Sequence, residues 1–230
     1  MKEQRVALIT GGSRGIGKAI AEKLLADGWK ISLGLRSPEP EWTDNPAVHT
    51  IQYDAMVGGE DVWLDAALER FGRVDAIVAN AGVMIAASVA EISDEDFDAM
   101  WRVNVKAPQR LARAAFPMLA VSGKGRIIVI ASLSGKRVAS VTSSAYAVTK
   151  HGAVALAHGL RQAGFDLGIR ATAICPGFVS SDMGRRLNPF DAEQMTTPEE
   201  IADITVHAIN LPNRASVAEI SVNCRAEQSF

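Results

Sequence analysis

Cysteine is scarce in this chain of 230 residues, which contains two, Cys175 and Cys224. Two cysteines form at most one bridge, which excludes a disulfide framework, and a chain of this length needs none. We therefore expect a reducing, cytoplasmic location. Histidine is also scarce, and the four histidines form no cluster with cysteine or acidic residues at the spacing of metal ligands. We accordingly expect no metal site.

The chain also lacks an excess of one charge and lacks long apolar runs. Its 24 basic and 26 acidic residues give a formal net charge of −2, without a basic cluster. This excludes the electrostatic footprint of nucleic-acid binding or of an anionic membrane surface. No apolar run is long enough to cross a bilayer, and residues 1–5 lead into Val6–Ile9 without a signal-peptide pattern. The expected partner is a small molecule, with no nucleic acid and no membrane.

What the chain does contain is 48% hydrophobic residues over a length that suits one large domain, so we predict a single domain over residues 1–230. Short apolar runs alternate with helix-like stretches, which is typical of a parallel sheet covered by helices on both faces. The predicted fold is therefore α/β, a Rossmann-type doubly wound sheet of seven parallel strands. The predicted strands are Val6–Ile9, Lys30–Leu35, His49–Tyr53, Ala76–Ala79, Arg126–Ile130, Arg170–Ile174 and Glu219–Val222.

Two segments carry the signals of a helix start. Ser93 offers a hydroxyl cap ahead of acidic residues and Phe97, and Thr197 precedes a first-turn proline and acidic residues. The prolines of Ser37–Pro46 predict a loop, and Ser180–Thr196 is predicted to be irregular.

A glycine-rich turn follows the first predicted strand and leads into a helical pattern. It reads Thr-Gly-Gly-Ser-Arg-Gly-Ile-Gly over residues 10–17. Gly11 would permit a tight turn, Gly15 the close approach of a pyrophosphate to the backbone, and Gly17 the close packing of helix on strand. The helix N-terminus would face the phosphate charge. The strand, turn and helix together predict a dinucleotide site.

The residue at the end of the second predicted strand indicates which dinucleotide binds. An acidic residue here would bond the ribose 2′-hydroxyl of NAD, whereas this chain has Arg36. Arg36 and Arg14 could together hold a 2′-phosphate through charge-assisted hydrogen bonds. The alternative is two solvated surface arginines. The pattern favours NADP(H) over NAD(H).

Tyr146 and Lys150 stand four residues apart in a predicted helix rich in small residues, so their side chains share one face. A free tyrosine has a pKa of about 10, and a nearby ammonium would lower it. The spacing therefore indicates an acid/base pair for proton transfer. An isolated pair of this kind could equally be an aromatic ring packed on a lysine stem.

Ser132 follows the buried strand Arg126–Ile130, at the strand edge where open α/β sheets bind ligands. Its hydroxyl could hold a substrate oxygen beside Tyr146. Ser134 and Ser144 are alternatives for the same role.

Taken in order, these motifs resemble those of the short-chain dehydrogenase/reductase family over almost the whole chain. The Thr-Gly-x-x-x-Gly-x-Gly turn is similar to that of the branch containing the 3-oxoacyl carrier-protein reductases. The motifs that carry the resemblance are residues 10–17, Asn80-Ala81-Gly82, Asn104, Ser132, Tyr146-x-x-x-Lys150 and Pro176-Gly177.

The resemblance implies an NADP(H)-dependent oxidoreductase acting on a carbonyl or an alcohol. Tyr146 would protonate the carbonyl oxygen, Ser132 would orient it, and Lys150 would lower the tyrosine pKa and bind the nicotinamide ribose. Asn104 resembles the asparagine that holds a water for proton relay to the lysine. The implied catalytic set is thus Asn104, Ser132, Tyr146 and Lys150.

The resemblance also implies which residues contact the cofactor. Asp54 would touch the adenine, Asn80–Gly82 would line the adenosine ribose, and Pro176, Gly177 and Val179 would face the carboxamide. The full implied set is Gly11, Ser13, Arg14, Gly15, Ile16, Gly17, Arg36, Asp54, Asn80, Ala81, Gly82, Tyr146, Lys150, Pro176, Gly177, Val179 and Ser181.

Some positions depart from the family pattern. Ala79 replaces the first of two asparagines often found before Ala-Gly, and Ser181 stands where threonine is common. Residues 223–225 replace a glycine-rich ending, which could alter contacts between subunits. None of these departures removes a catalytic group. The resemblance implies a homodimer or homotetramer.

A second class of function is a protein that binds the dinucleotide as a redox-sensing or interaction module without turnover. Loss of Tyr146 or Lys150 would have favoured that alternative, and both are present.

Overall fold

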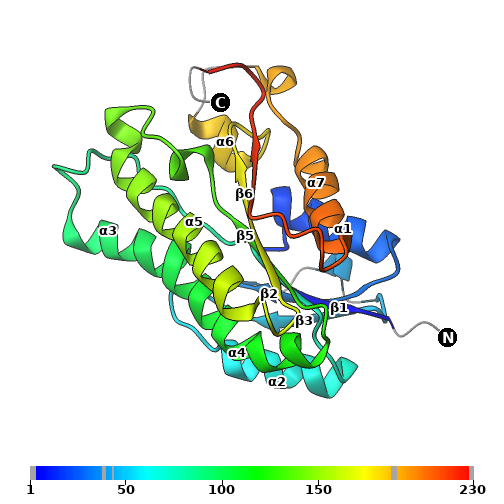
Figure 1. Ribbon diagram of the computed structural model, residues 1–230. Helices are drawn as coiled ribbons and strands as arrows, with labels where there is room; N and C mark the ends of the chain where they lie inside the picture. The colour runs from blue at the N-terminus through cyan, green and yellow to red at the C-terminus, as the bar shows by residue number, and fades with distance from the viewer. Residues whose placement is uncertain (1–3, 38–39, 43, 188–190, 228–230) are drawn as a thin grey trace.

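The computed structural model describes residues 4–37, 40–42, 44–187 and 191–227. Its seven strands form one sheet in the order β3-β2-β1-β4-β5-β6-β7, and every neighbouring pair is parallel (Figure 1). The order reverses between β1 and β4, which creates the crevice where doubly wound sheets bind ligands. The predicted fold class is confirmed.

The strands coincide closely with the apolar runs of the sequence. They are β1 Val6–Thr10, β2 Lys30–Leu35, β3 Val48–Gln52, β4 Ala76–Ala79, β5 Arg126–Ile130, β6 Arg170–Pro176 and β7 Glu219–Val222. β3 lies one residue earlier than predicted. Tyr53 has left the strand, and its hydroxyl donates to Glu60 Oε1 at 2.8 Å.

α-Helices connect successive strands except β2 and β3, which have only a 3₁₀ turn between them. They are α1 Gly15–Ala26, α2 Glu60–Phe71, α3 Asp94–Trp101, α4 Ala107–Val121, α5 Ser144–Gly164, α6 Asp182–Leu187 and α7 Pro198–Asn210. Short 3₁₀ turns lie at Pro40–Trp42, Leu133–Gly135, Val141–Ser143 and Ala192–Gln194, and a π-helical turn spans Arg102–Lys106.

The helices cover the sheet on both faces (Figure 1). α1 and α7 pack on one face, where Ile20, Leu24 and Ile201 join the inward side chains of the strands. α2, α4 and α5 pack on the other face, where Trp63 and Leu111 are fully buried. Strands β1, β4 and β5 are buried along their whole length, as unalternating apolar sequences require.

Both predicted helix starts are confirmed. Ser93 Oγ accepts from the backbone N–H of Asp96 at 3.1 Å, and Thr197 forms a reciprocal capping box with Glu200. The prediction that Ser180–Thr196 is irregular is wrong in part, because α6 begins at Asp182 and the 3₁₀ turn Ala192–Gln194 follows. In the predicted loop Ser37–Pro46, residues 38, 39 and 43 lie outside the described residues, and Pro40–Trp42 forms a 3₁₀ turn.

Parallel strands bring their carboxyl ends to one edge of the sheet. Thr10, Ala79, Ile130 and Pro176 end neighbouring strands there. The segments that follow these residues carry almost every predicted site residue, so the topology gathers them although they are far apart in the sequence. Among the described residues, no helix is long and apolar enough to cross a membrane.

Candidate active site

The glycine turn after β1 has an open cradle shape that could hold a dinucleotide. Gly11 and Gly15 have φ values of +68° and +54°, in the left-handed region that favours glycine. A Cβ at Gly17 would lie 2.2 Å from the carbonyl oxygen of Gly11 and 2.4 Å from Asn80 Nδ2. The tight contact of Gly17 is therefore with the turn itself and with β4, rather than with a strand face. Side chains at these positions would fill the cradle, and the N–H groups at the start of α1 remain available to a phosphate.

Asn80 locks this turn to the end of β4. Its Nδ2 donates to the carbonyl oxygens of Thr10 and Gly11, each at 3.1 Å. Thr10 Oγ1 in turn accepts from the backbone N–H groups of Asn80 and Ala81, each at 2.9 Å. Sequence reasoning missed the role of Thr10, although this threonine stands first in the motif. Ser13 and Ile16 lie half-buried in the same turn.

Gly82 lies where the cofactor cradle meets the catalytic groups. A Cβ at this position would lie 3.4 Å from Asn104 Oδ1 and 3.6 Å from Lys150 Nζ. The absence of a side chain lets both polar groups approach the backbone after β4. The structure therefore joins three predicted residues that are separated by up to 68 positions in the sequence.

Asn104 is buried in the π-helical turn between α3 and α4. Its Oδ1 accepts from the backbone N–H of Val83 at 3.0 Å, and its Nδ2 donates to Val83 O at 2.9 Å and to Thr149 Oγ1 at 3.0 Å. Thr149 Oγ1 donates to the carbonyl oxygen of Tyr146 at 2.8 Å. Asn104 thus ties the segment after β4 to the helix that carries Tyr146 and Lys150. Sequence reasoning missed Thr149, although its place beside Lys150 could have indicated it.

Tyr146 lies in the first turns of α5 and is 7% exposed. It packs with Met100, Ala145 and partly buried apolar residues of the segment after β4. Burial raises the pKa of Tyr146 above its ordinary value, and a hydrogen bond with Ser132 opposes this shift. Lys150 is not among the causes of this net shift, so the expectation that its ammonium lowers the pKa of Tyr146 stays a prediction.

Ser132 is the serine that meets Tyr146. It caps the 3₁₀ turn after β5, where its Oγ accepts from the backbone N–H of Ser134 at 3.0 Å. Ser134 thus holds Ser132 rather than replacing it. Ser144 Oγ instead accepts from the backbone N–H of Val89 at 2.8 Å and donates to Val141 O at 2.6 Å. Those contacts hold a neighbouring loop. Of the three candidate serines, Ser132 is therefore the one whose hydroxyl contacts Tyr146.

Lys150 is 4% exposed, one turn after Tyr146 on α5. Its Nζ donates to the carbonyl oxygen of Ile130 at 2.9 Å and lies 5.6 Å from the centre of the Tyr146 ring. Burial lowers the pKa of Lys150 to about 8, and nearby Cys175 opposes that shift. The ammonium therefore titrates near the physiological range.

The segment after β6 closes the carboxyl edge of the sheet. Pro176 ends β6, and the N–H of Gly177 donates to Val222 O at 2.8 Å. Val179 is buried and bridges to Thr196. A Cβ at Gly15 would lie 3.4 Å from Ser181 Cβ, so this segment reaches the glycine turn.

The outer cofactor residues are more scattered. Asp54 is half-buried, and its Oδ1 accepts from the backbone N–H of Met56 at 2.9 Å. Arg36 is exposed just beyond β2, and the structure gives it no ion-pair partner among the described residues. Arg14 is paired with Asp182, with Nη1 and Oδ2 2.6 Å apart. The structure does not join Arg36 to Arg14 or Asp54 by any contact.

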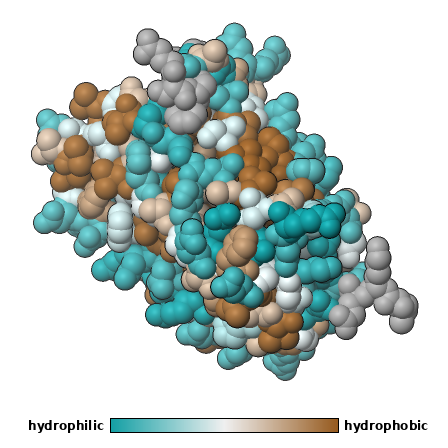
Figure 2. Space-filling model, in the orientation of Figure 1, coloured by the Kyte–Doolittle hydropathy of each residue, from teal (hydrophilic) through white to brown (hydrophobic). Residues whose placement is uncertain are grey.

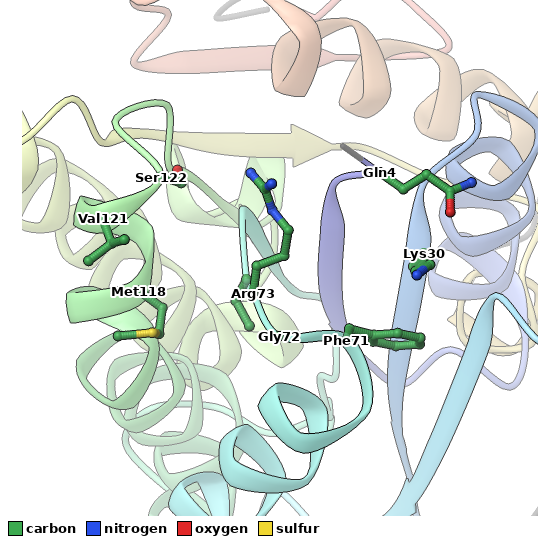
Figure 3. A pocket seen from close by; sticks show the side chains of 9 residues that line it. Gln4, Lys30, Phe71, Gly72, Arg73, Met118, Val121 and Ser122 are labelled. Atoms are coloured by element: carbon green, nitrogen blue, oxygen red, sulfur yellow. The ribbon is translucent and has the colours of Figure 1, made fainter. Parts of the chain in front are cut away.

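A cavity of about 570 Å³ lies at the opposite, amino-terminal edge of the sheet (Figure 3). It is lined by residues such as Lys30, Phe71, Arg73 and Met118, and by none of the predicted site residues. The volume of a cavity therefore does not identify the catalytic site in this protein. In the part of the chain that the structure describes, no group of three or more His, Cys, Asp or Glu side chains could hold a metal ion.

Three valines are exposed on the segments that precede α3 and α5. Val89, Val138 and Val141 are 54%, 58% and 72% exposed, on the loops before α3 and before α5. Figure 2 shows apolar side chains over the end of the molecule where these loops lie, whereas much of the remaining face is hydrophilic.

A seven-stranded parallel sheet in this order, with a glycine turn after its first strand, defines a doubly wound dinucleotide-binding protein. The sequence matches the short chain dehydrogenase family over residues 5–192. The chain therefore belongs to the short-chain dehydrogenase/reductase family of oxidoreductases, and the resemblance seen in the sequence is confirmed at that level. Its place in the branch with the 3-oxoacyl carrier-protein reductases stays a prediction.

Relatives in other organisms agree with this membership. An agropine synthesis reductase of Rhizobium rhizogenes is 38% identical over 96% of this chain and 53% of its own length. The chain thus spans about half the length of that relative. An uncharacterised oxidoreductase of Staphylococcus aureus (strain USA300) is 30% identical, over 95% of this chain and 96% of its own.

Solved structures show the same fold. An alcohol dehydrogenase from the archaeon Thermococcus sibiricus, complexed with 5-hydroxy-NADP, has a TM-score of 0.87 at 30% identity, covering 98% of this chain and all (100%) of its own. ElxO with NADP bound has a TM-score of 0.87 at 22% identity, covering 96% and 98% of the two chains.

Proposed function

We propose that this protein transfers hydride between NADP(H) and a carbonyl or secondary alcohol, with Tyr146 as general acid/base. The observation that carries the proposal is the gathering of Tyr146, Ser132 and Lys150 in one water-poor site beside the glycine turn. The hydride comes from the reduced nicotinamide when the cofactor is bound. The side chains of the protein transfer the proton and orient the substrate oxygen.

The protonated phenol of Tyr146 is the acid of carbonyl reduction. Burial raises its pKa, so the hydroxyl keeps its proton at neutral pH and can donate it to the carbonyl oxygen as negative charge develops there. Ser132, hydrogen-bonded to Tyr146, can donate a second hydrogen bond to the same oxygen. In alcohol oxidation the proton returns along the same path.

Lys150 supplies positive charge beside the phenol. Its ammonium favours the phenolate that remains after proton transfer. Asn104 acts through its contacts with Val83 and Thr149, which hold the backbone of α5 in register with the segment after β4. Both donors of its amide are used in these contacts, and the water relay implied by the family stays a prediction.

The choice of NADP(H) over NAD(H) rests on charge. Arg36 stands where an acidic residue would bond the ribose of NAD, and Arg14 is a second guanidinium at the start of α1. Solved relatives of this fold have been captured with NADP or a derivative of it. The implied contacts of Asp54, of residues 80–82 and of Pro176, Gly177, Val179 and Ser181 remain part of this proposal.

Turnover with a panel of carbonyl compounds tests the function. We expect NADPH oxidation, followed by absorbance, with at least one compound among ketones, aldehydes, quinones and a 3-oxoacyl thioester. NADH measured in parallel should bind more weakly in a fluorescence titration. NADPH binding without turnover of any compound would support the alternative, a redox-sensing or interaction module. Tighter binding of NADH would refute the cofactor choice.

The pH dependence of carbonyl reduction should report the titration of Lys150. Burial lowers the pKa of Lys150 to about 8, so the side chain is an ammonium below that pH and a neutral amine above it. Because the ammonium is the form that favours the phenolate, kcat/KM should decline as the pH rises through about 8. The phenol of Tyr146 stays protonated across this range, since its pKa is raised. A pH profile that is flat from about pH 7 to about pH 10 would contradict the assignment.

The oligomeric state and the cellular location are also proposals that rest on the family. A homodimer or homotetramer in a cytoplasmic setting agrees with the family, and light scattering on the purified chain would measure the mass of the assembly.

A further inference from the structure

An ion pair joins the glycine turn to the short helix α6. Arg14, the residue before α1, contacts Asp182, the first residue of α6, with Nη1 and Oδ2 2.6 Å apart. The two side chains are 63% and 51% exposed. Both therefore remain within reach of a ligand that approaches from solvent.

The pair lies at a hollow beside the proposed cofactor site. A cavity of about 360 Å³ is lined by Arg14, Gly15, Ser181, Asp182 and Arg185, together with residues of α1 and α7. Gly15 belongs to the phosphate cradle, so this surface continues from it. A negative group seated near the cradle would meet the guanidinium of Arg14 and the carboxylate of Asp182 together.

Among the described residues, the Arg14–Asp182 pair is also the polar contact that ties α6 to a distant part of the chain. The other polar contacts of α6 stay within residues 180–185: Ser181 Oγ accepts from the N–H of Gly184 at 3.3 Å, and Arg185 donates to Ser180 and Ser181. Release of Arg14 would therefore free α6 from the glycine turn.

We propose that Asp182 competes with the 2′-phosphate of NADPH for Arg14, which makes it a residue that sets the affinity for NADPH relative to NADH. This inference rests on the proposed function. A phosphate bonds a guanidinium through charge-assisted contacts, as a carboxylate does. The carboxylate neutralises the charge that the phosphate needs, and it repels the phosphate as well. NADH carries no 2′-phosphate, so it does not enter this competition.

The substitution Asp182→Asn tests the competition through binding alone. Exposed ion pairs contribute little, so we expect NADPH to bind about two- to fivefold more tightly, with the dissociation constant of NADH unchanged in the same fluorescence titration. High salt should reduce the difference, because it screens exposed charges.

Two matched variants isolate the cause. Asp203→Asn removes the same charge from another exposed ion pair, with Lys23 at 2.6 Å, and should leave NADPH binding unchanged. In an Arg14→Gln background, Asp182→Asn should no longer tighten NADPH binding, because the contested group is absent.

The outcomes separate this inference from the proposed function. NADPH binding that is unaffected by Asp182→Asn, in a wild-type protein that binds and turns over NADPH, overturns the inference alone. An equal gain for NADPH and NADH also overturns it, since that result indicates general repulsion of the dinucleotide. Absence of NADPH binding to the wild-type chain overturns both.

Discussion

Replacement of Tyr146 by phenylalanine is expected to lower kcat for carbonyl reduction by about a thousandfold, within the range of a lost general acid. The substitution removes the hydroxyl proposed to protonate the carbonyl oxygen and keeps the ring that packs with Met100 and Ala145. NADPH binding should persist, because the cradle is built from the glycine turn and Asn80. Steady-state turnover and a fluorescence titration on the same preparation measure both quantities.

The chain provides its own control for this experiment. Its only other tyrosine, Tyr53, is also buried, and its hydroxyl donates to Glu60 at 2.8 Å. Tyr53→Phe removes the same atom at a distance from the catalytic cluster and should cost about 1 kcal/mol of stability while kcat stays near the wild-type value. Turnover by Tyr146→Phe at the rate of Tyr53→Phe would end the assignment of Tyr146 as the acid.

Replacement of Gly17 by alanine is expected to weaken NADPH binding by at least about tenfold and to destabilise the fold by about 1–3 kcal/mol. The new methyl group would lie 2.2 Å from the carbonyl oxygen of Gly11 and 2.4 Å from Asn80 Nδ2. One contact is backbone and the other side chain is held by two hydrogen bonds, so the turn itself must shift. Fluorescence titration and chemical denaturation measure the two effects.

Gly159→Ala is the matched control, because Gly159 is also a helical glycine and a Cβ there meets nothing within 4 Å. That change should stabilise the protein by up to about 1 kcal/mol, through helix propensity, and leave NADPH binding unchanged. If Gly17→Ala behaved like Gly159→Ala, the cradle would not depend on the contact between Gly17 and Gly11.

The strands and the cofactor turn were predictable because their signals are local. Unalternating apolar runs indicate strands that are buried on both faces, and the strands β2, β4, β5 and β7 begin and end as predicted. The tight turn predicted at Gly11 agrees with the positive φ values of Gly11 and Gly15 in the structure. The α6 helix was missed because it is only six residues long, although Ser181 and Asp182 form a start signal that could have indicated it.

The sequence predicted which residues belong to the catalytic cluster, but it did not predict the contacts between them. Tyr146 and Lys150 share a helix, so helical spacing relates them directly. Residue patterns left Ser134 and Ser144 as alternatives to Ser132, and the resemblance favoured Ser132. The contact itself depends on where the turn after β5 meets α5. Thr149 was overlooked for the same reason, because its contact with Asn104 spans 45 positions of the chain.

The sequence by itself indicated the approximate positions of the strands, because apolar periodicity is a property of neighbouring residues. The family and the residues that can carry hydride chemistry followed from the resemblance of the sequence motifs. Only the tertiary structure decided that Ser132 meets Tyr146, that Arg14 pairs with Asp182, and that the pKa of Tyr146 is raised rather than lowered. These outcomes depend on contacts between segments far apart in the sequence and on how completely the fold removes water from a side chain. Neither quantity is a property of neighbouring residues.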